Sequence, residues 1–122
     1  MSGLVLTVGP GHTLREVSRQ MAERRIGSAA VIDPDSPGPA IITERDILIA
    51  IAGGQDPDSE LVGDHLTEVL ISASPDWSLE RAAQAMIDGG FRHLLVVDGA
   101  EIVGVLSMRD IVRCWTGHRV GA

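Results

Sequence analysis

Two short segments of this chain combine a hydroxyl group and a carboxyl group at the same spacing. They are Thr43-Glu-Arg-Asp46 and Ser107-Met-Arg-Asp110, and each follows an apolar run. This order predicts a strand that leads directly into a helix. The amide groups at a helix start attract phosphate, and an aspartate can accept hydrogen bonds from two vicinal ribose hydroxyls. The pattern is therefore typical of nucleotide binding.

The same segments also have a structural interpretation. Thr/Ser-x-x-Asp is a variant of the capping box, in which side chain and backbone exchange hydrogen bonds at a helix start. The acid also offsets the positive end of the helix dipole. The two interpretations are compatible, and the sequence alone leaves both open.

A basic pair precedes a predicted strand in the second half of the chain. Arg92 and His93 lead into the apolar run Leu94–Val97. Arginine offers a planar fork of donors that suits phosphate, and histidine offers a further donor. The alternative is a solvated pair at the start of a strand. The first half has Gly27-Ser28 at this place, so we expect any anion site to be stronger in the second half.

Other chemistries find little support. The histidines, His12, His65, His93 and His118, lack the close pairing that is typical of zinc ligands. Cys114 is the only cysteine, which excludes an intrachain disulfide and a multi-cysteine metal site. No nucleophile with a partner base is visible. We therefore predict no catalytic residues, no metal site and no enzymatic activity.

An internal repeat predicts the elements that position these residues. Thr13–Asp33 aligns with Ser78–Asp98 at an offset of 65, and residues 40–48 align with 104–112 at an offset of 64. Each copy is predicted to form strand, helix, strand, strand, helix. The predicted strands are Leu4–Val8, Ala29–Ile32, Ile41–Ile42, Leu70–Ala73, Leu94–Val97 and Ile102–Leu106, and the helices follow Thr13 and Ser78 and cover 44–52 and 108–115.

Two copies indicate a pseudo-symmetric pair, because a solenoid needs at least three units. We divide the chain into a first copy, residues 1–58, and a second copy, residues 59–122, with a linker at 53–58. Helices 44–52 and 108–115 carry Ile47, Ile51, Ile111 and Trp115, which we expect to need a second surface.

Composition narrows the classes of partner. The chain has 122 residues, 10 basic and 17 acidic, and a formal net charge of −7. Every basic residue among these is arginine. A net anion is not attracted to nucleic acid or to an anionic membrane. No apolar run approaches the roughly 20 residues that span a bilayer, and no signal peptide is evident. We expect a soluble cytoplasmic protein with no nucleic-acid or membrane partner.

Taken together, these motifs resemble a tandem pair of cystathionine-β-synthase-type (CBS) domains, also called a Bateman module. In the second half the resemblance rests on the segments 62–67, 74–79, 90–98 and Gly104-x-x-Ser107-x-x-Asp110. In the first half it rests on Gly9–Leu14 and Thr43–Asp46. The resemblance covers nearly the whole chain. It implies an α+β fold of two β-α-β-β-α motifs, packed through their sheets about a pseudo-twofold axis.

The resemblance also implies ligand sites in the clefts between the copies. The ligand class is adenosyl: AMP, ADP or ATP, with S-adenosylmethionine and NAD less favoured. Carried over onto this sequence, Asp110 holds the ribose hydroxyls, Ser107 the ribose or phosphate, and Arg92, His93 and Arg109 the phosphates. The adenine is flanked by Thr67, Val69 and Ile71.

A second site takes Ser28, Thr43, Arg45 and Asp46 in corresponding roles. We expect it to be weaker, because Gly27-Ser28 lacks the basic pair and Ala40 replaces the usual glycine. By the repeat offset, the counterpart of residues 61–66 falls before the first strand, and we expect the first pocket to lack the wall that this segment supplies.

The function that the resemblance implies is regulatory. We expect a non-catalytic module that senses an adenine nucleotide, forms a homodimer and signals to an effector protein whose identity the sequence does not give. The alternative is a dimeric interaction scaffold with vestigial nucleotide pockets.

Overall fold

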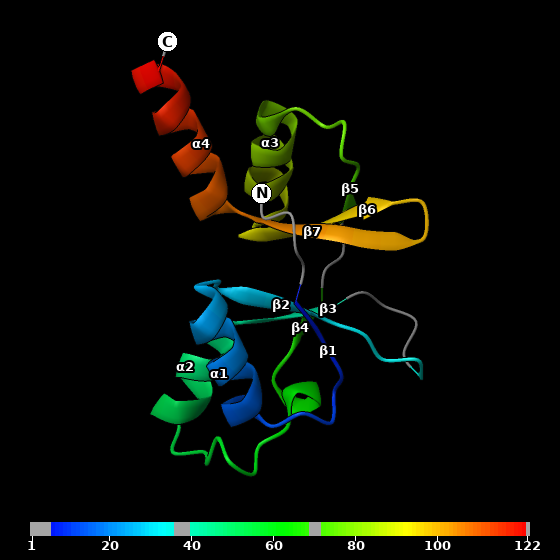
Figure 1. Cartoon of the computed structure of the whole chain (residues 1–122), viewed down its shortest axis with the longest axis vertical. Coiled ribbons are helices and arrows are strands. Elements are labelled where there is room, and N and C mark those ends of the chain that lie inside the picture. Colours follow the sequence, from blue (N-terminus) through cyan, green and yellow to red (C-terminus); the bar gives the residue numbers. More distant parts are fainter. Residues whose placement is uncertain (1–5, 36–39, 69–71, 122) are drawn as a thin grey trace. The chain divides into compact units, whose positions relative to one another are not determined.

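The computed structural model describes residues 6–35, 40–68 and 72–121. The described residues form two compact units, 6–68 and 72–121, which we call the first unit and the second unit. Each has a mixed sheet with two helices, so the predicted α+β class is confirmed. In each unit both helices lie on one face of the sheet (Figure 1).

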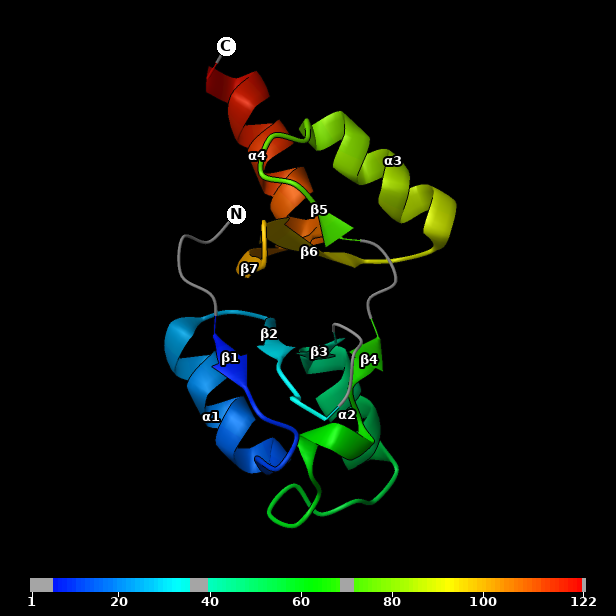
Figure 2. The same cartoon turned by 90° about the vertical axis from the view of Figure 1, so that its right-hand side faces the viewer.

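The first unit has a four-stranded sheet in the order β1-β2-β3-β4 (Figure 2). Strands β1 and β2 are parallel, and the other pairs are antiparallel. The elements are β1 (Thr7–Val8), α1 (Leu14–Arg24), β2 (Ser28–Val31), β3 (Ala40–Thr43), α2 (Glu44–Ala52), the 3₁₀ turn η1 (Val62–Asp64) and β4 (Thr67–Glu68).

The second unit repeats the plan with three described strands in the order β5-β6-β7. Strands β5 and β6 are parallel, and β6 and β7 form an antiparallel hairpin with an irregularity between Val96 and Val97. The elements are β5 (Ser72–Ala73), α3 (Leu79–Gly89), β6 (His93–Asp98), β7 (Glu101–Ser107) and α4 (Met108–Gly121). Helix α4 is longer than the predicted 108–115.

The predicted helix starts are confirmed. The Thr13 hydroxyl accepts a hydrogen bond from the Glu16 amide at 3.1 Å, and the Ser78 hydroxyl accepts one from the Arg81 amide at 3.0 Å. Helix α3 ends at Gly90, whose φ of 72° is in the left-handed region that glycine adopts without strain.

A segment that the repeat assigns to the second copy packs onto the first unit. The Val62 side chain is fully buried in the core of the first unit. The Val62 amide donates to the His12 carbonyl, and the Leu14 amide donates to the Glu60 carbonyl, both at 2.9 Å. The compact first unit therefore extends past residue 58, and the boundary at 58 and 59 stays a prediction about the sequence repeat.

An ion pair holds the same segment. The Arg15 Nε donates to Asp58 Oδ1 at 2.8 Å. The hydrogen bond from Arg15, followed by its charge, holds the pKa of the Asp58 carboxyl below its usual range. Both groups are exposed, so this pair contributes little stability but orients the segment.

We predict that Val62→Ala destabilises the first unit, although Val62 lies outside its α-helices. The loss of buried methyl groups from this core lowers the free energy of unfolding by about 2 kcal/mol. Leu61→Ala is the control, because the neighbouring Leu61 side chain is 39% exposed. Urea unfolding measures both variants. Equal effects of the two substitutions would show that Val62 is not part of this core.

Candidate functional site

In the second unit, the strand-to-helix motif forms the predicted capping box. Ser107 ends β7, and Asp110 lies in the first turn of α4. The Ser107 amide donates to Asp110 Oδ2 at 2.9 Å, and the Asp110 amide donates to Ser107 Oγ at 3.0 Å. Both residues are half-buried. The box therefore fixes a carboxylate at the positive end of a helix.

The β6–β7 hairpin brings the predicted basic residues to this motif. His93 pairs with Ser107 in the antiparallel register, and the Met108 amide donates to the Arg92 carbonyl at 2.9 Å. Five predicted site residues thus meet at one end of the hairpin: Arg92, His93, Ser107, Arg109 and Asp110. Arg92 and Arg109 are exposed, as residues that bind an incoming anion must be.

The first unit builds the same arrangement around Thr43 and Asp46. The Thr43 amide donates to Asp46 Oδ2 at 3.0 Å, and the Asp46 amide donates to Thr43 Oγ1 at 3.1 Å. Ser28 pairs with Thr43 in the β2–β3 register, as His93 pairs with Ser107. Arg45 is exposed on the first turn of α2. The four residues predicted for the weaker site therefore lie together.

Thr67 lies against the first motif, although the family resemblance assigned it to the second. Its hydroxyl donates to the Asp46 carboxylate, 3.0 Å from each oxygen. This contact forms because β4 pairs with β3, with Thr67 opposite Ile41. No periodicity predicts this contact, since a two-residue strand is too short to show one. Val69 and Ile71 lie outside the described residues.

The carboxylates of Asp46 and Asp110 differ in the number of hydrogen bonds that they accept from protein groups. Both oxygens of Asp46 accept hydrogen bonds from protein groups. For Asp110, only Oδ2 has a hydrogen-bond partner within the described ranges. A carboxylate oxygen has two lone pairs to offer, so the Asp110 Oδ1 is the more available acceptor.

Among the described residues, no group of three or more His, Cys, Asp or Glu side chains is placed to hold a metal ion. Within the same part of the chain, no helix is long and apolar enough to cross a membrane.

Comparison with known proteins identifies the family. The family model of the CBS domain matches residues 1–53 and again residues 62–117. The chain belongs to the CBS domain family and carries a pair of these domains.

Similar proteins agree with this assignment. A CBS domain-containing protein of Bacillus subtilis, YhcV, is 32% identical over 91% of this chain and 79% of its own length. A CBS domain protein from Pyrobaculum aerophilum, solved in complex with AMP, is 31% identical with a TM-score of 0.79, over 100% of this chain and 95% of that one. A hexameric CBS-CP12 protein from bloom-forming cyanobacteria shares the fold, with a TM-score of 0.83 at 24% identity over 92% of this chain and 66% of that one.

Some relatives are longer than this chain. The chain spans 57% of an uncharacterised protein from Methanopyrus kandleri, at 32% identity over 89% of this chain. It spans 66% of a 17.7 kDa protein from Acidianus ambivalens, at 36% identity over 89% of this chain. The similarity therefore covers the CBS pair and not every part of these proteins.

We predict that Thr67→Val weakens the first unit. The substitution keeps the shape of the side chain but removes the hydroxyl that joins β4 to the start of α2, which costs about 1 kcal/mol of unfolding free energy. Thr7→Val is the matched control, since Thr7 is an exposed strand residue whose hydroxyl has no partner in the described part of the chain. Urea unfolding compares them, and an equal change in both variants would contradict the role given to Thr67.

Proposed function

We propose that this chain is a regulatory module that binds an adenine nucleotide at the second motif and reports its presence to a partner protein. The observation that carries the proposal is the convergence of Arg92, His93, Ser107 and Asp110 at one end of the β6–β7 hairpin. A similar CBS domain protein solved in complex with AMP supports the ligand class.

Each group has a chemical role in this proposal. The available Oδ1 of Asp110 accepts hydrogen bonds from the ribose hydroxyls. The Arg92 and Arg109 guanidinium groups, with His93, bind phosphate oxygens through charge-assisted hydrogen bonds. Ser107 donates from its hydroxyl to the ribose or phosphate. These roles are non-catalytic, because they bind the nucleotide without activating a nucleophile. AMP, ADP and ATP fit them, and S-adenosylmethionine and NAD fit less well.

The first motif is proposed as the weaker site. Gly27 and Ser28 stand where the second unit has Arg92 and His93, so this site lacks both residues of the basic pair. The Asp46 carboxylate already accepts hydrogen bonds from Thr43 and Thr67. Thr67, which donates to Asp46, is proposed for this site, and Val69 and Ile71 stay proposed beside the adenine of the second site.

A homodimer is part of the proposal, with a revised set of contact residues. Ile47 and Ile111 are buried in the cores of their own units, so they do not need a second surface. On α2, the side chains of Leu48, Ile49 and Ile51 are exposed, at 65%, 60% and 50%. This apolar face also favours the second candidate function, a dimeric scaffold with vestigial nucleotide pockets. A cytoplasmic location stays a prediction.

A thermal-shift experiment tests the proposal. AMP at about 100 times its Kd stabilises the fold by about 2.7 kcal/mol. Asp110→Ala removes most of this ligand-induced shift. Ser78→Ala is the control, since it removes the side-chain cap of α3 in the same unit but leaves both motifs intact. ADP, ATP, S-adenosylmethionine and NAD are screened in parallel.

Two outcomes would contradict the proposal. A dimer in sedimentation that shows no shift with any of these ligands would favour the scaffold. A shift that survives Asp110→Ala unchanged would move the nucleotide site elsewhere.

A further inference from the structure

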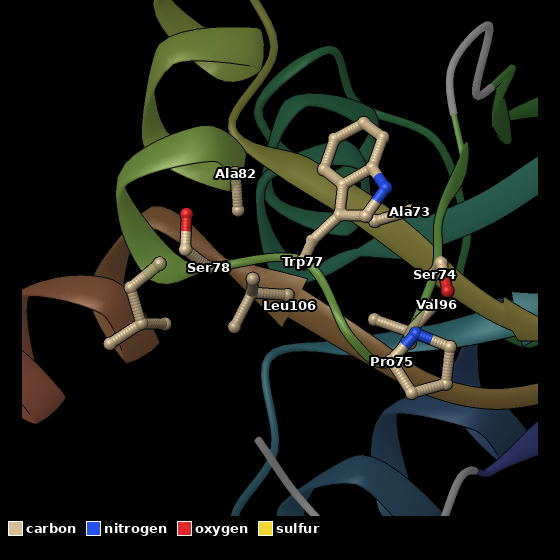
Figure 3. Close-up of a pocket in the computed structure, with 9 residues that line it drawn as sticks. Ala73, Ser74, Pro75, Trp77, Ser78, Ala82, Val96 and Leu106 are labelled. Carbon is tan, nitrogen blue, oxygen red and sulfur yellow. The ribbon is translucent and has the colours of Figure 1, made fainter.

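A pocket of about 130 Å³ opens beside the start of α3 in the second unit. Its lining includes Trp77 and the core residues Ala73, Ala82, Val96 and Leu106 (Figure 3). Leu79 also lines it. The Arg81 guanidinium lies over the Trp77 ring, 4.0 Å from its centroid. The lining is mainly apolar, and it has no part in the proposed nucleotide site.

The repeat aligns lining residues of this pocket with core residues of the first unit, where Val62 packs against them. At the offset of 65, the lining residues Ala73, Leu79, Ala82 and Val96 correspond to Val8, Leu14, Val17 and Val31. These four counterparts belong to the core cluster that contains the buried Val62 side chain. The pocket therefore lies where the first unit inserts Val62.

The two units differ in how far the leucine at this position is exposed. Leu14 is 1% exposed, whereas its counterpart Leu79 is 38% exposed. In the first unit, residues 60–62 lie over this position and form two backbone hydrogen bonds, to the Leu14 amide and the His12 carbonyl. The counterparts are the Leu79 amide and the Trp77 carbonyl, and neither has a hydrogen-bond partner in the described part of the second unit.

The size of the pocket indicates the side chain that fits. Val8 and Val17 of the first unit are replaced by Ala73 and Ala82. The smaller residues leave more room than Val62 fills in the first unit. Leucine or isoleucine is therefore the expected occupant.

The charge of Glu80 indicates which residue the occupant should carry near the inserted side chain. In the first unit, Arg15 of α1 pairs with Asp58 of the inserted segment. The counterpart of Arg15 is Glu80, which carries the opposite charge. An occupant built like residues 57–66 would place Asp58 against Glu80. The charge therefore favours a segment with a basic residue at that position and disfavours a second copy of this chain.

We propose that this pocket receives an extended segment of a partner polypeptide. The segment inserts one leucine or isoleucine, bonds through its backbone to the Trp77 carbonyl and the Leu79 amide, and places a basic residue beside Glu80. The inference goes beyond the proposed nucleotide function, because it names a contact surface for the partner.

The test is a titration of the isotope-labelled full chain, followed by NMR. The probe is a synthetic peptide of residues 57–66 carrying Asp58→Lys and Val62→Leu. We expect saturable shifts of the Trp77 indole and the Leu79 amide. Leu79→Ala lowers the affinity for the peptide about tenfold, because apolar contact is lost. Ile87→Ala is the matched control, because Ile87 is 67% exposed on the same helix, and it leaves the affinity unchanged.

A second peptide that keeps Asp58 tests the charge. The unchanged chain prefers the lysine peptide by about two- to fivefold, and Glu80→Arg reverses this preference. The absence of shifts at millimolar peptide, or an equal loss with Ile87→Ala, would overturn the proposal. Loss of self-association in Leu79→Ala would assign the pocket to a second copy instead. AMP added to the same samples reports on the nucleotide site independently.

Discussion

The reciprocal hydrogen bonds at the strand-to-helix junctions are the constraint on which both units depend. Thr43 ends β3 and caps α2, and Ser107 ends β7, which is followed directly by α4. Because no loop intervenes, the cap must satisfy the backbone at the turn, and the carboxylates of Asp46 and Asp110 do so. The same geometry holds each carboxylate at the positive end of a helix. One group therefore serves the fold and, in our proposal, the ligand.

Much of the fold could be predicted because its signals are local or repeated. The caps at Thr13 and Ser78 and the turn at Gly90 are each specified by a few neighbouring residues. The position of Val62 could not be predicted in this way. Its burial depends on backbone hydrogen bonds to a loop about 50 residues earlier in the chain, and the repeat places it in the other copy. The same packing produces β4, which is too short to form without β3 as a partner.

In the candidate site, too, the contacts within a hairpin could be predicted and the long-range contacts could not. His93 and Ser107 meet because a hairpin register joins two strands that the sequence predicts in succession along the chain. The contact between Thr67 and Asp46 depends instead on the segment that folds back onto the first unit. This contact sharpens an asymmetry that the sequence suggested for a different reason, the absence of a basic pair at Gly27-Ser28. The apolar residues of α2 and α4 show that residue type alone does not predict which side chains are buried. Ile47 and Ile111 are core residues, whereas Leu48 is exposed.

In the proposed site, the Oδ1 atom of Asp110 accepts hydrogen bonds from the ribose hydroxyls of an adenine nucleotide. Calorimetric titration of AMP and of 2′,3′-dideoxy-AMP, into the unchanged chain and into Asp110→Asn, tests it directly. We predict that removal of the hydroxyls weakens binding to the unchanged chain by about tenfold or more, as expected for hydrogen bonds to a charged group. In Asp110→Asn the two ligands should bind with similar affinity. Equal binding of both ligands to the unchanged chain would contradict the account.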